Sequence, residues 1–358
     1  MLKNRAALLV IIVLSTFFET IAQMPGTGGA AKRTDKNFQF LPLPYVNYSR
    51  SLEFSYGVMP MAMYNLNKSD TISPSSVSGG LYMRTTNGTW FGMGFSKFYL
   101  KQDQWRIMVA GGSGNVNFQF YPDLPFLPEV VDYSTGADFI MSTVERRVAE
   151  NMYVGLGYSW INMATAFDIE GVPTQYVTLN GINLSYSIDK RDDVYYPHKG
   201  YITNARFNLF PEWMGNQASS NKLELDFNQY FEMPNERDVV AARAFVGIGL
   251  GELDFNQQFI VGKTDLRGYS QGEYRGEQLY ALQGEYRWNI TEKFGLVGFA
   301  GVATLTNATN EDHNGKLLPA GGGGFRINVF PQNHMNIGLD AGVGQGDWGI
   351  EFRIGEAF

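Results

Sequence analysis

Residues 335–358 read MNIGLDAGVGQGDWGIEFRIGEAF, and residues 324–330 before them read GFRINVF. Apolar side chains alternate with polar side chains or glycine through both stretches, and this period of two is typical of β-strands. On one face of the last segment, which we predict to run over 348–358, lie Trp348, Ile350, Phe352, Ile354 and the terminal Phe358. One face suits an apolar medium and the other suits water. The pattern therefore favours a membrane barrel, with a secreted all-β domain as the alternative.

The N-terminus has the pattern of a secretory signal peptide. Lys3 and Arg5 give a basic start, residues 6–18 form an apolar run, and Ala22 ends a plausible cleavage site. The apolar run has 13 residues, fewer than the roughly 20 that a helix needs to span a bilayer. We expect a signal peptide over residues 1–22 and a flexible, Gly-rich periplasmic leader over residues 23–36, followed by one barrel over residues 37–358.

The composition excludes several classes of function. Cysteine is absent, which rules out disulfides, a thiol nucleophile and thiolate metal ligation. Removal of the signal peptide changes 28 basic and 35 acidic residues to 26 and 34, a formal charge of −8, so nucleic acid is not an expected partner. The three histidines, His198, His313 and His334, have no metal-ligand spacing. We expect no metal, no cofactor and no catalytic residues.

Alternating runs predict the number of strands. Fifteen runs can be read, and a sixteenth within residues 37–48 gives the even number typical of outer-membrane barrels, although Pro42 and Pro44 interrupt it. The expected fold is an all-β, sixteen-stranded antiparallel transmembrane barrel. The fifteen runs cover residues 52–66, 76–86, 89–100, 105–120, 131–147, 152–164, 175–189, 200–210, 222–233, 239–250, 278–289, 294–305, 317–330, 335–344 and 348–358.

The lengths of the connections predict an orientation. Counting back from the C-terminus, they alternate between short and long, and residues 251–277 form the longest. Outer-membrane barrels have short periplasmic turns and longer external loops. We therefore expect a periplasmic C-terminus in the bacterial outer membrane, with residues 251–277 outside.

Four motifs, taken in order, resemble one family. The long loop contains Leu266-Arg267-Gly268-Tyr269, the following strand contains Gly284-Glu285-Tyr286-Arg287, and the chain ends in the alternating segments quoted above. An acidic-basic turn precedes them, formed by Asp189, Arg191, Asp192, Pro197 and Gly200. Together these residues resemble the outer-membrane assembly-factor superfamily of BamA, TamA and the two-partner secretion transporters. The resemblance implies that the sixth external loop folds into the lumen and that the terminal strand, Trp348 to Phe358, is a targeting signal.

An arginine inside a barrel needs acidic partners, because an unpaired, partly desolvated guanidinium is costly. Alternation directs Glu285 and Asp340 inward, so we predict them as partners of Arg267. The pair can also be a purely structural lock that restrains the loop. The same alternation predicts an inward face containing Lys222, Glu224, Asp226, Asn228, Arg287, Arg326 and Arg353.

The chain departs from the family pattern at two places. Where family members usually carry an aspartate, this chain has Phe299. Only about fifteen to thirty residues separate the predicted signal peptide from the first strand, far fewer than a periplasmic POTRA domain requires. We expect a minimal member without POTRA domains, which works with a periplasmic partner or by self-association.

The resemblance implies a role in outer-membrane protein assembly, translocation or lipid biogenesis. Such a barrel would open laterally between its first and last strands, where Gly349 and Gly355 reduce side-chain packing. The alternative for these two glycines is that they only relieve crowding in a curved wall. Outer-membrane lipids and client outer-membrane proteins are the implied partners. The alternatives are a passive pore, a structural barrel and, as a third interpretation, a lumenal phospholipase, for which no single serine stands out.

Overall fold

The computed structural model describes residues 38–50, 52–120, 131–169, 171–251, 253, 257–262, 265–270, 273–330 and 334–358. The predicted signal peptide and leader lie outside the described residues. Within these ranges no helix is long and apolar enough to cross a membrane.

Sixteen long strands and the two-residue strand β12 make up the sheet, which confirms the predicted number. The first eight are β1 (Phe38–Ser49), β2 (Glu53–Tyr64), β3 (Ser76–Thr85), β4 (Trp90–Leu100), β5 (Trp105–Phe120), β6 (Val131–Ala149), β7 (Met152–Phe167) and β8 (Gln175–Asp189). The others are β9 (Gly200–Phe210), β10 (Ser220–Glu232), β11 (Val239–Leu250), β12 (Phe259–Ile260), β13 (Arg275–Asn289), β14 (Phe294–Ala308), β15 (Leu318–Phe330), β16 (Met335–Gly344) and β17 (Asp347–Ile354). Two 3₁₀ turns, η2 (Glu212–Met214) and η3 (Glu311–His313), lie in connections.

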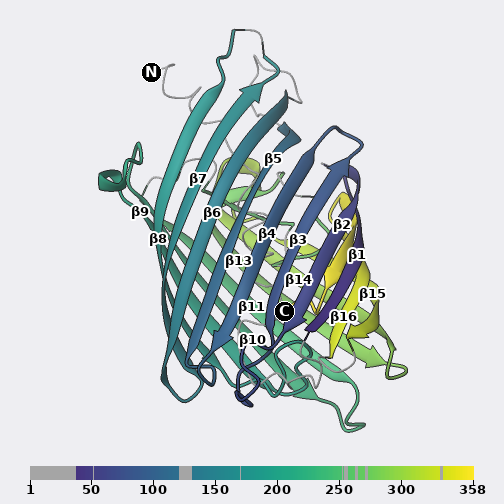
Figure 1. Ribbon diagram of the computed structural model, residues 1–358. Helices are drawn as coiled ribbons and strands as arrows, with labels where there is room; N and C mark the ends of the chain where they lie inside the picture. The colour runs from purple at the N-terminus through teal and green to yellow at the C-terminus, as the bar shows by residue number, and fades with distance from the viewer. Residues whose placement is uncertain are drawn as a thin grey trace.

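The strands form one closed antiparallel barrel. Each long strand pairs with the next one along the chain, β11 pairs with β13, and β1 closes the barrel by pairing with β17. Figure 1 shows the purple β1 between β2 and the yellow C-terminal strands. We call the end with the long connection 251–274 the loop end, and the opposite end, where β17 finishes, the turn end.

Alternation along each strand separates an interior face from an exterior face. In β13 the residues Leu279, Ala281, Gln283, Glu285 and Arg287 are buried, while their neighbours Tyr280, Leu282, Tyr286 and Trp288 are exposed. The seven polar residues predicted to face inward are also buried. The exterior is instead rich in apolar side chains: Leu282 is 60% exposed and Leu156 is 59% exposed. Exposed apolar surface of this extent is typical of contact with lipid.

The last strand differs from its prediction. β17 ends at Ile354, not at Phe358, because Gly355 has a positive φ of 74° that breaks the extended conformation. Residues 355–357 are buried, and Phe358 packs against an interior cluster of apolar residues. Phe358 therefore does not continue the exterior apolar row of Trp348, Ile350, Phe352 and Ile354.

Candidate functional site

The tip of the long connection is held by side chains from the interior face of the barrel. Arg267 is 1% exposed; its Nη1 lies 2.7 Å from Asp340 Oδ2, and its Nη2 lies 2.7 Å from Glu285 Oε2. Its Nε donates a hydrogen bond to Gln283 at 3.0 Å. The structure thus places Arg267 beside both carboxylates that alternation directs inward, one from β13 and one from β16.

The Phe299 ring lies against the guanidinium of Arg267. The Arg267 Cζ lies 3.6 Å from the centroid of the Phe299 ring, which is a close cation–π contact. Phe299 lies in β14, at the position where the resemblance led us to expect an aspartate. The aromatic ring gives the arginine a favourable surface without adding another charge, so Arg267 is held by two carboxylates, the Gln283 amide and one ring.

Gly268 and Tyr269 fit closely against β16. Gly268 has a φ of 107°, and a Cβ on it would lie 2.8 Å from the backbone of Val343, so only glycine suits this position. The Tyr269 hydroxyl donates to Pro319 O at 2.8 Å and accepts from the Gln345 N–H at 3.0 Å. Leu266 is 1% exposed within a cluster of apolar residues that also contains Tyr269.

Ser270 connects this loop to both strands that close the barrel. Its hydroxyl donates to Asp347, the first residue of β17, at 3.0 Å, and it accepts from the N–H of Arg50, which follows β1, at 3.2 Å. The Arg50 side chain also donates to Gly346 O at 2.7 Å. The loop therefore contacts the closing pair of strands at its loop end.

A cluster of four arginines and four carboxylates extends from Arg267 towards the turn end. Asp340 accepts from Arg326 at 2.5 and 3.1 Å and from Arg353 at 3.0 Å. Glu285 accepts from Arg287 at 2.7 Å, and Glu356 accepts from Arg326 at 3.0 Å. Arg353 also donates to Glu351 at 2.8 Å. Equal numbers of opposite charges offset the cost of burying each one, but loss of one member would leave its partner unpaired.

The pairing that closes the barrel is short. β1 and β17 align at only two residue pairs, Tyr48 with Ile350 and Ser49 with Gly349. By comparison, twelve pairs align β1 with β2, and eight align β16 with β17. Two aromatic contacts supplement the short ladder: Tyr48 stacks on Trp348 at 4.7 Å, and Tyr45 meets Phe352 edge to face at 6.0 Å. We call this junction the seam.

The turn before β9 is a compact network of its own. Asp189 accepts two hydrogen bonds from the Arg191 guanidinium, each at 3.0 Å. Asp192 accepts from the backbone N–H groups of His198 and Lys199 at 2.9 and 3.1 Å. Burial alone would raise the pKa of Asp192, but hydrogen bonds from His198 and Lys199 lower it to about 2.

Gly200 completes this turn, with Pro197 three residues before it. Gly200 has a φ of 92°, and a Cβ on it would lie 2.0 Å from Lys190 O. The turn therefore depends on glycine for its closure. These contacts stabilise the turn end, and none joins the arginine–carboxylate cluster.

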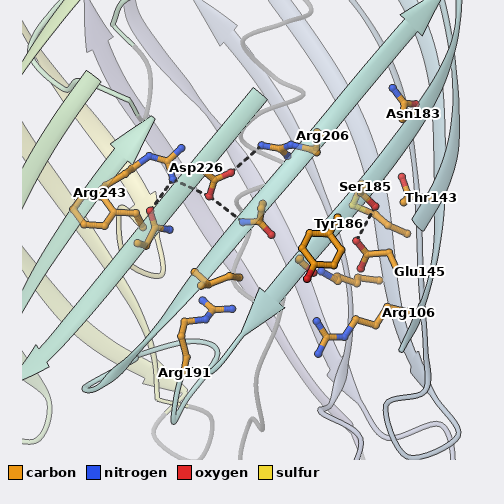
Figure 2. A pocket seen from close by; sticks show the side chains of 17 residues that line it. Arg106, Thr143, Glu145, Asn183, Ser185, Tyr186, Arg191, Arg206, Asp226 and Arg243 are labelled. Atoms are coloured by element: carbon orange, nitrogen blue, oxygen red, sulfur yellow. Dashed lines mark hydrogen bonds and ion pairs between the residues drawn. The ribbon is translucent and has the colours of Figure 1, made fainter. Parts of the chain in front are cut away.

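A cavity of about 130 Å³ lies inside the barrel, lined mainly by polar residues of β4 to β6 and β8 to β11. Figure 2 shows Asp226 between Arg206 and Arg243, with ion-pair distances of 3.6 and 3.7 Å. Phe358 also lines this cavity. Within the described part of the chain, no group of three or more His, Asp or Glu residues could hold a metal ion.

Sequence reasoning missed several members of the site. It did not propose that Arg326, Arg353 and Glu356 belong to one cluster. It also did not propose the link at the seam that Ser270, Asp347 and Arg50 form. Alternation indicated that the first two arginines face inward, but it carried no information on which strands approach the loop tip. Glu356 was predicted to lie in an extended strand. The only feature of the sequence that could have indicated its inward position is the neighbouring Gly355, which can turn the chain.

Comparisons with known proteins agree with this fold. The family model described as the Omp85 superfamily domain matches residues 76–346. BamA from Haemophilus ducreyi lacking POTRA domains 1–3 is similar over 95% of this chain and 76% of that chain, with 12% identity and a TM-score of 0.58. No curated protein matches the sequence significantly.

Two CdiB structures are also similar. CdiB from Acinetobacter baumannii matches over 94% of this chain and 66% of that chain, with 10% identity and a TM-score of 0.60. CdiB from Escherichia coli matches over 89% and 63%, with 10% identity and a TM-score of 0.63. The chain thus spans about two thirds of these two relatives, and at such identities the likeness shows the fold alone.

Proposed function

Because this chain belongs to the Omp85 superfamily, we propose that it is an integral outer-membrane barrel that assembles or translocates envelope components through its seam. The substrates under this proposal are client outer-membrane proteins or lipids. The chemistry is non-enzymatic: a client strand or an acyl chain passes between β1 and β17 when they part.

The short seam is the observation that carries this proposal. Two aligned residue pairs leave β1 and β17 with far fewer shared backbone hydrogen bonds than a long antiparallel pair has. Since the other neighbouring long strands are aligned over many residues, separation of the barrel wall needs the least free energy at this junction. The exterior apolar surface beside it supports contact with membrane lipids.

The loop tip regulates the seam under the same proposal. Arg267 anchors the loop inside the barrel, and Ser270 connects it to both seam strands at the loop end. Opening would then break these contacts first. We further propose that the turn end faces the periplasm, where a periplasmic protein or a second copy of the chain delivers clients.

A disulfide across the seam tests the proposal. The pair Ser49→Cys and Gly349→Cys joins residues that are aligned in the seam, and the chain has no cysteine that could interfere. Purified protein in liposomes is given an unfolded outer-membrane protein, and the yield of protease-resistant, folded client is measured. We expect oxidation to abolish this yield and a reductant to restore it.

The matched control is Val109→Cys with Ser142→Cys, which joins aligned residues of β5 and β6 away from the seam. Its oxidation should leave the yield unchanged. Full activity of a completely crosslinked seam would refute lateral opening. Crosslinking in cells followed by mass spectrometry then identifies clients and any periplasmic partner.

A passive pore is the second candidate, and the polar interior cavity favours it. Planar-bilayer recordings distinguish the two functions. Stable conductance by the purified chain, together with no effect of the seam disulfide on cells, would support the pore. The arginine–carboxylate cluster argues against it, because the cluster and the loop tip occupy part of the interior.

A further inference from the structure

The last four residues leave the barrel wall and enter its interior. Gly355 turns the chain, and its N–H donates to Asn336 O at 2.7 Å. Glu356 and Ala357 are 9% and 2% exposed. The C-terminal tail, residues 355–358, is therefore bound by groups on other strands and does not extend β17.

A set of polar groups receives the acidic side chain of the tail. Glu356 accepts from Arg326 Nε at 3.0 Å and from Asn336 Nδ2 at 2.8 Å. Arg287 Nε lies 3.6 Å from the same carboxylate. Both arginines are buried, and three strands, β13, β15 and β16, contribute one group each. Charge-assisted hydrogen bonds in such a site are strong and directional.

The end of the chain has its own contacts in the same region. Arg287 Nη2 donates to the main-chain oxygen of Phe358 at 2.7 Å. The Phe358 side chain packs against a buried cluster that consists of Tyr196, Ile202, Tyr230, Val239 and Ala241. One guanidinium thus contacts both the acidic side chain and the terminal residue, while an apolar pocket receives the Phe358 ring.

Two prolines lie where a longer seam would have to pair with the tail. Pro42 in β1 is aligned with Pro60 in β2. The Phe54 carbonyl accepts from Thr86, which follows β3, so the even-numbered residues of β2 direct their peptide groups towards β3. The even-numbered residues of β1 are aligned with these residues of β2. The peptide groups of the even-numbered β1 residues, Pro42 among them, therefore point away from β2 and towards the seam.

Pro42 and Pro44 therefore offer no N–H to β17. If β17 continued in the register that aligns Ser49 with Gly349, residue 354 would face Pro44 and residue 356 would face Pro42. The carbonyl oxygens of residues 354 and 356 would then lack hydrogen-bond donors from β1, because proline has no N–H. Arg287, Arg326 and Asn336 in the interior instead supply hydrogen bonds to the tail, which β1 cannot supply at its two prolines.

We propose that Arg287, Arg326, Asn336 and the adjoining apolar pocket form a binding site for a peptide carboxyl terminus, which the chain fills with its own tail. The ligand class is a peptide that ends in an aromatic residue with a free carboxylate and carries an acidic side chain two positions earlier. The tail is thereby an intramolecular latch that holds the end of the seam strand β17 inside the barrel.

The latch is tested in the full chain with Ala357→Cys as the only cysteine. Because Ala357 is 2% exposed, a water-soluble maleimide should label this cysteine slowly in the folded barrel in detergent. Adding Glu356→Gln should increase the labelling rate at least about tenfold, because the carboxylate loses its charge-assisted bonds. The matched control is Glu351→Gln, which removes an acid from β17 that contacts Arg353 but not the tail.

Rapid labelling in the parent variant, or equal rates with and without Glu356→Gln, would overturn the latch. A second experiment probes the site directly, with a chain lacking residues 355–358 and a fluorescent peptide Ile-Gly-Glu-Ala-Phe. We expect the free acid to bind at least about tenfold more tightly than its C-terminal amide or its glutamine analogue. Equal affinities would contradict the carboxylate site. If the truncated chain does not fold, the labelling experiment in the full chain is the test of the latch.

Discussion

The hydroxyl of Ser270 lies 3.0 Å from a carboxylate oxygen of Asp347, although 77 positions separate the two residues in the chain. The first belongs to the long loop and the second begins the last strand of the barrel. Since the same hydroxyl accepts from Arg50 beside β1, one side chain joins the loop to both sides of the seam.

Ser270→Ala should weaken the seam at its loop end. The substitution removes one hydroxyl that makes two hydrogen bonds, at a cost of about 1–2 kcal/mol. The measurement is the rate of disulfide formation between Ser49→Cys and Gly349→Cys, which falls when the aligned strands part more often, because the bond needs the two Cβ atoms close together. Ser270→Thr retains the hydroxyl and is the control, and both variants keep the backbone N–H that also donates to Asp347. An unchanged rate in Ser270→Ala would show that the hydroxyl does not restrain the seam.

Arg267→Ala should destabilise the barrel by about 3–5 kcal/mol, because it leaves Glu285 and Asp340 without one of their cationic partners in a buried site. The expected readout is a lower midpoint for the loss of folded, fast-migrating protein on heating in detergent. Arg267→Lys keeps the charge but cannot reach Gln283 and both carboxylates at once, so an intermediate midpoint is expected. A parental midpoint in Arg267→Ala would exclude an energetic role for this anchor.

Replacing both Pro42 and Pro44 by threonine should lengthen the seam. Threonine restores two backbone donors and is favoured in strands, so residues beyond Ile354 gain partners in the wall. We expect slower amide hydrogen exchange at residues 42–46 and 352–356, and less client folding in liposomes. The reference is Pro60→Thr, whose peptide group faces β3, and identical exchange in the double variant would contradict the assigned direction of the two prolines.

Acid should weaken the turn at Asp192. Its pKa in the folded chain is about 2, below its ordinary value of 3.8, so the stabilisation is complete above pH 3.8 and is lost as the pH falls towards 2. Because the carboxyl is partly exposed, we expect a loss below about 1 kcal/mol. Thermal midpoints between pH 5 and pH 2 should fall less steeply in Asp192→Asn, whereas parallel profiles would exclude this carboxylate.

The sequence predicted the strands well because alternation is a local property. A run such as residues 278–289 shows its interior face without reference to any other strand, and β13 has that face. The short β12 and the early end of β17 were not predicted. Two residues in β12 are too few for a period, and a single glycine at position 355 has several conformations open to it.

Contacts across the interior were predictable only in part. The need of a buried arginine for carboxylates, together with alternation, indicated Glu285 and Asp340 beside Arg267. The role of Phe299 was not predicted, because an aromatic residue in place of the expected aspartate suggested only that a negative charge was missing. Only its position beneath the guanidinium shows that it replaces one favourable contact with another.

The sequence by itself determined most of the strands, their inward and outward faces, and the residues available for ion pairs, because each depends on neighbours in the chain. Sixteen strands and closure followed from the even number typical of outer-membrane barrels, and the pairing of β1 with β17 bears them out. The tertiary structure decided the short seam, the link from Ser270 to both closing strands and the inward turn of the C-terminal tail. These features depend on how far each strand is shifted against the next around a closed barrel. That shift brings residues tens of positions apart into contact, and no local pattern encodes it.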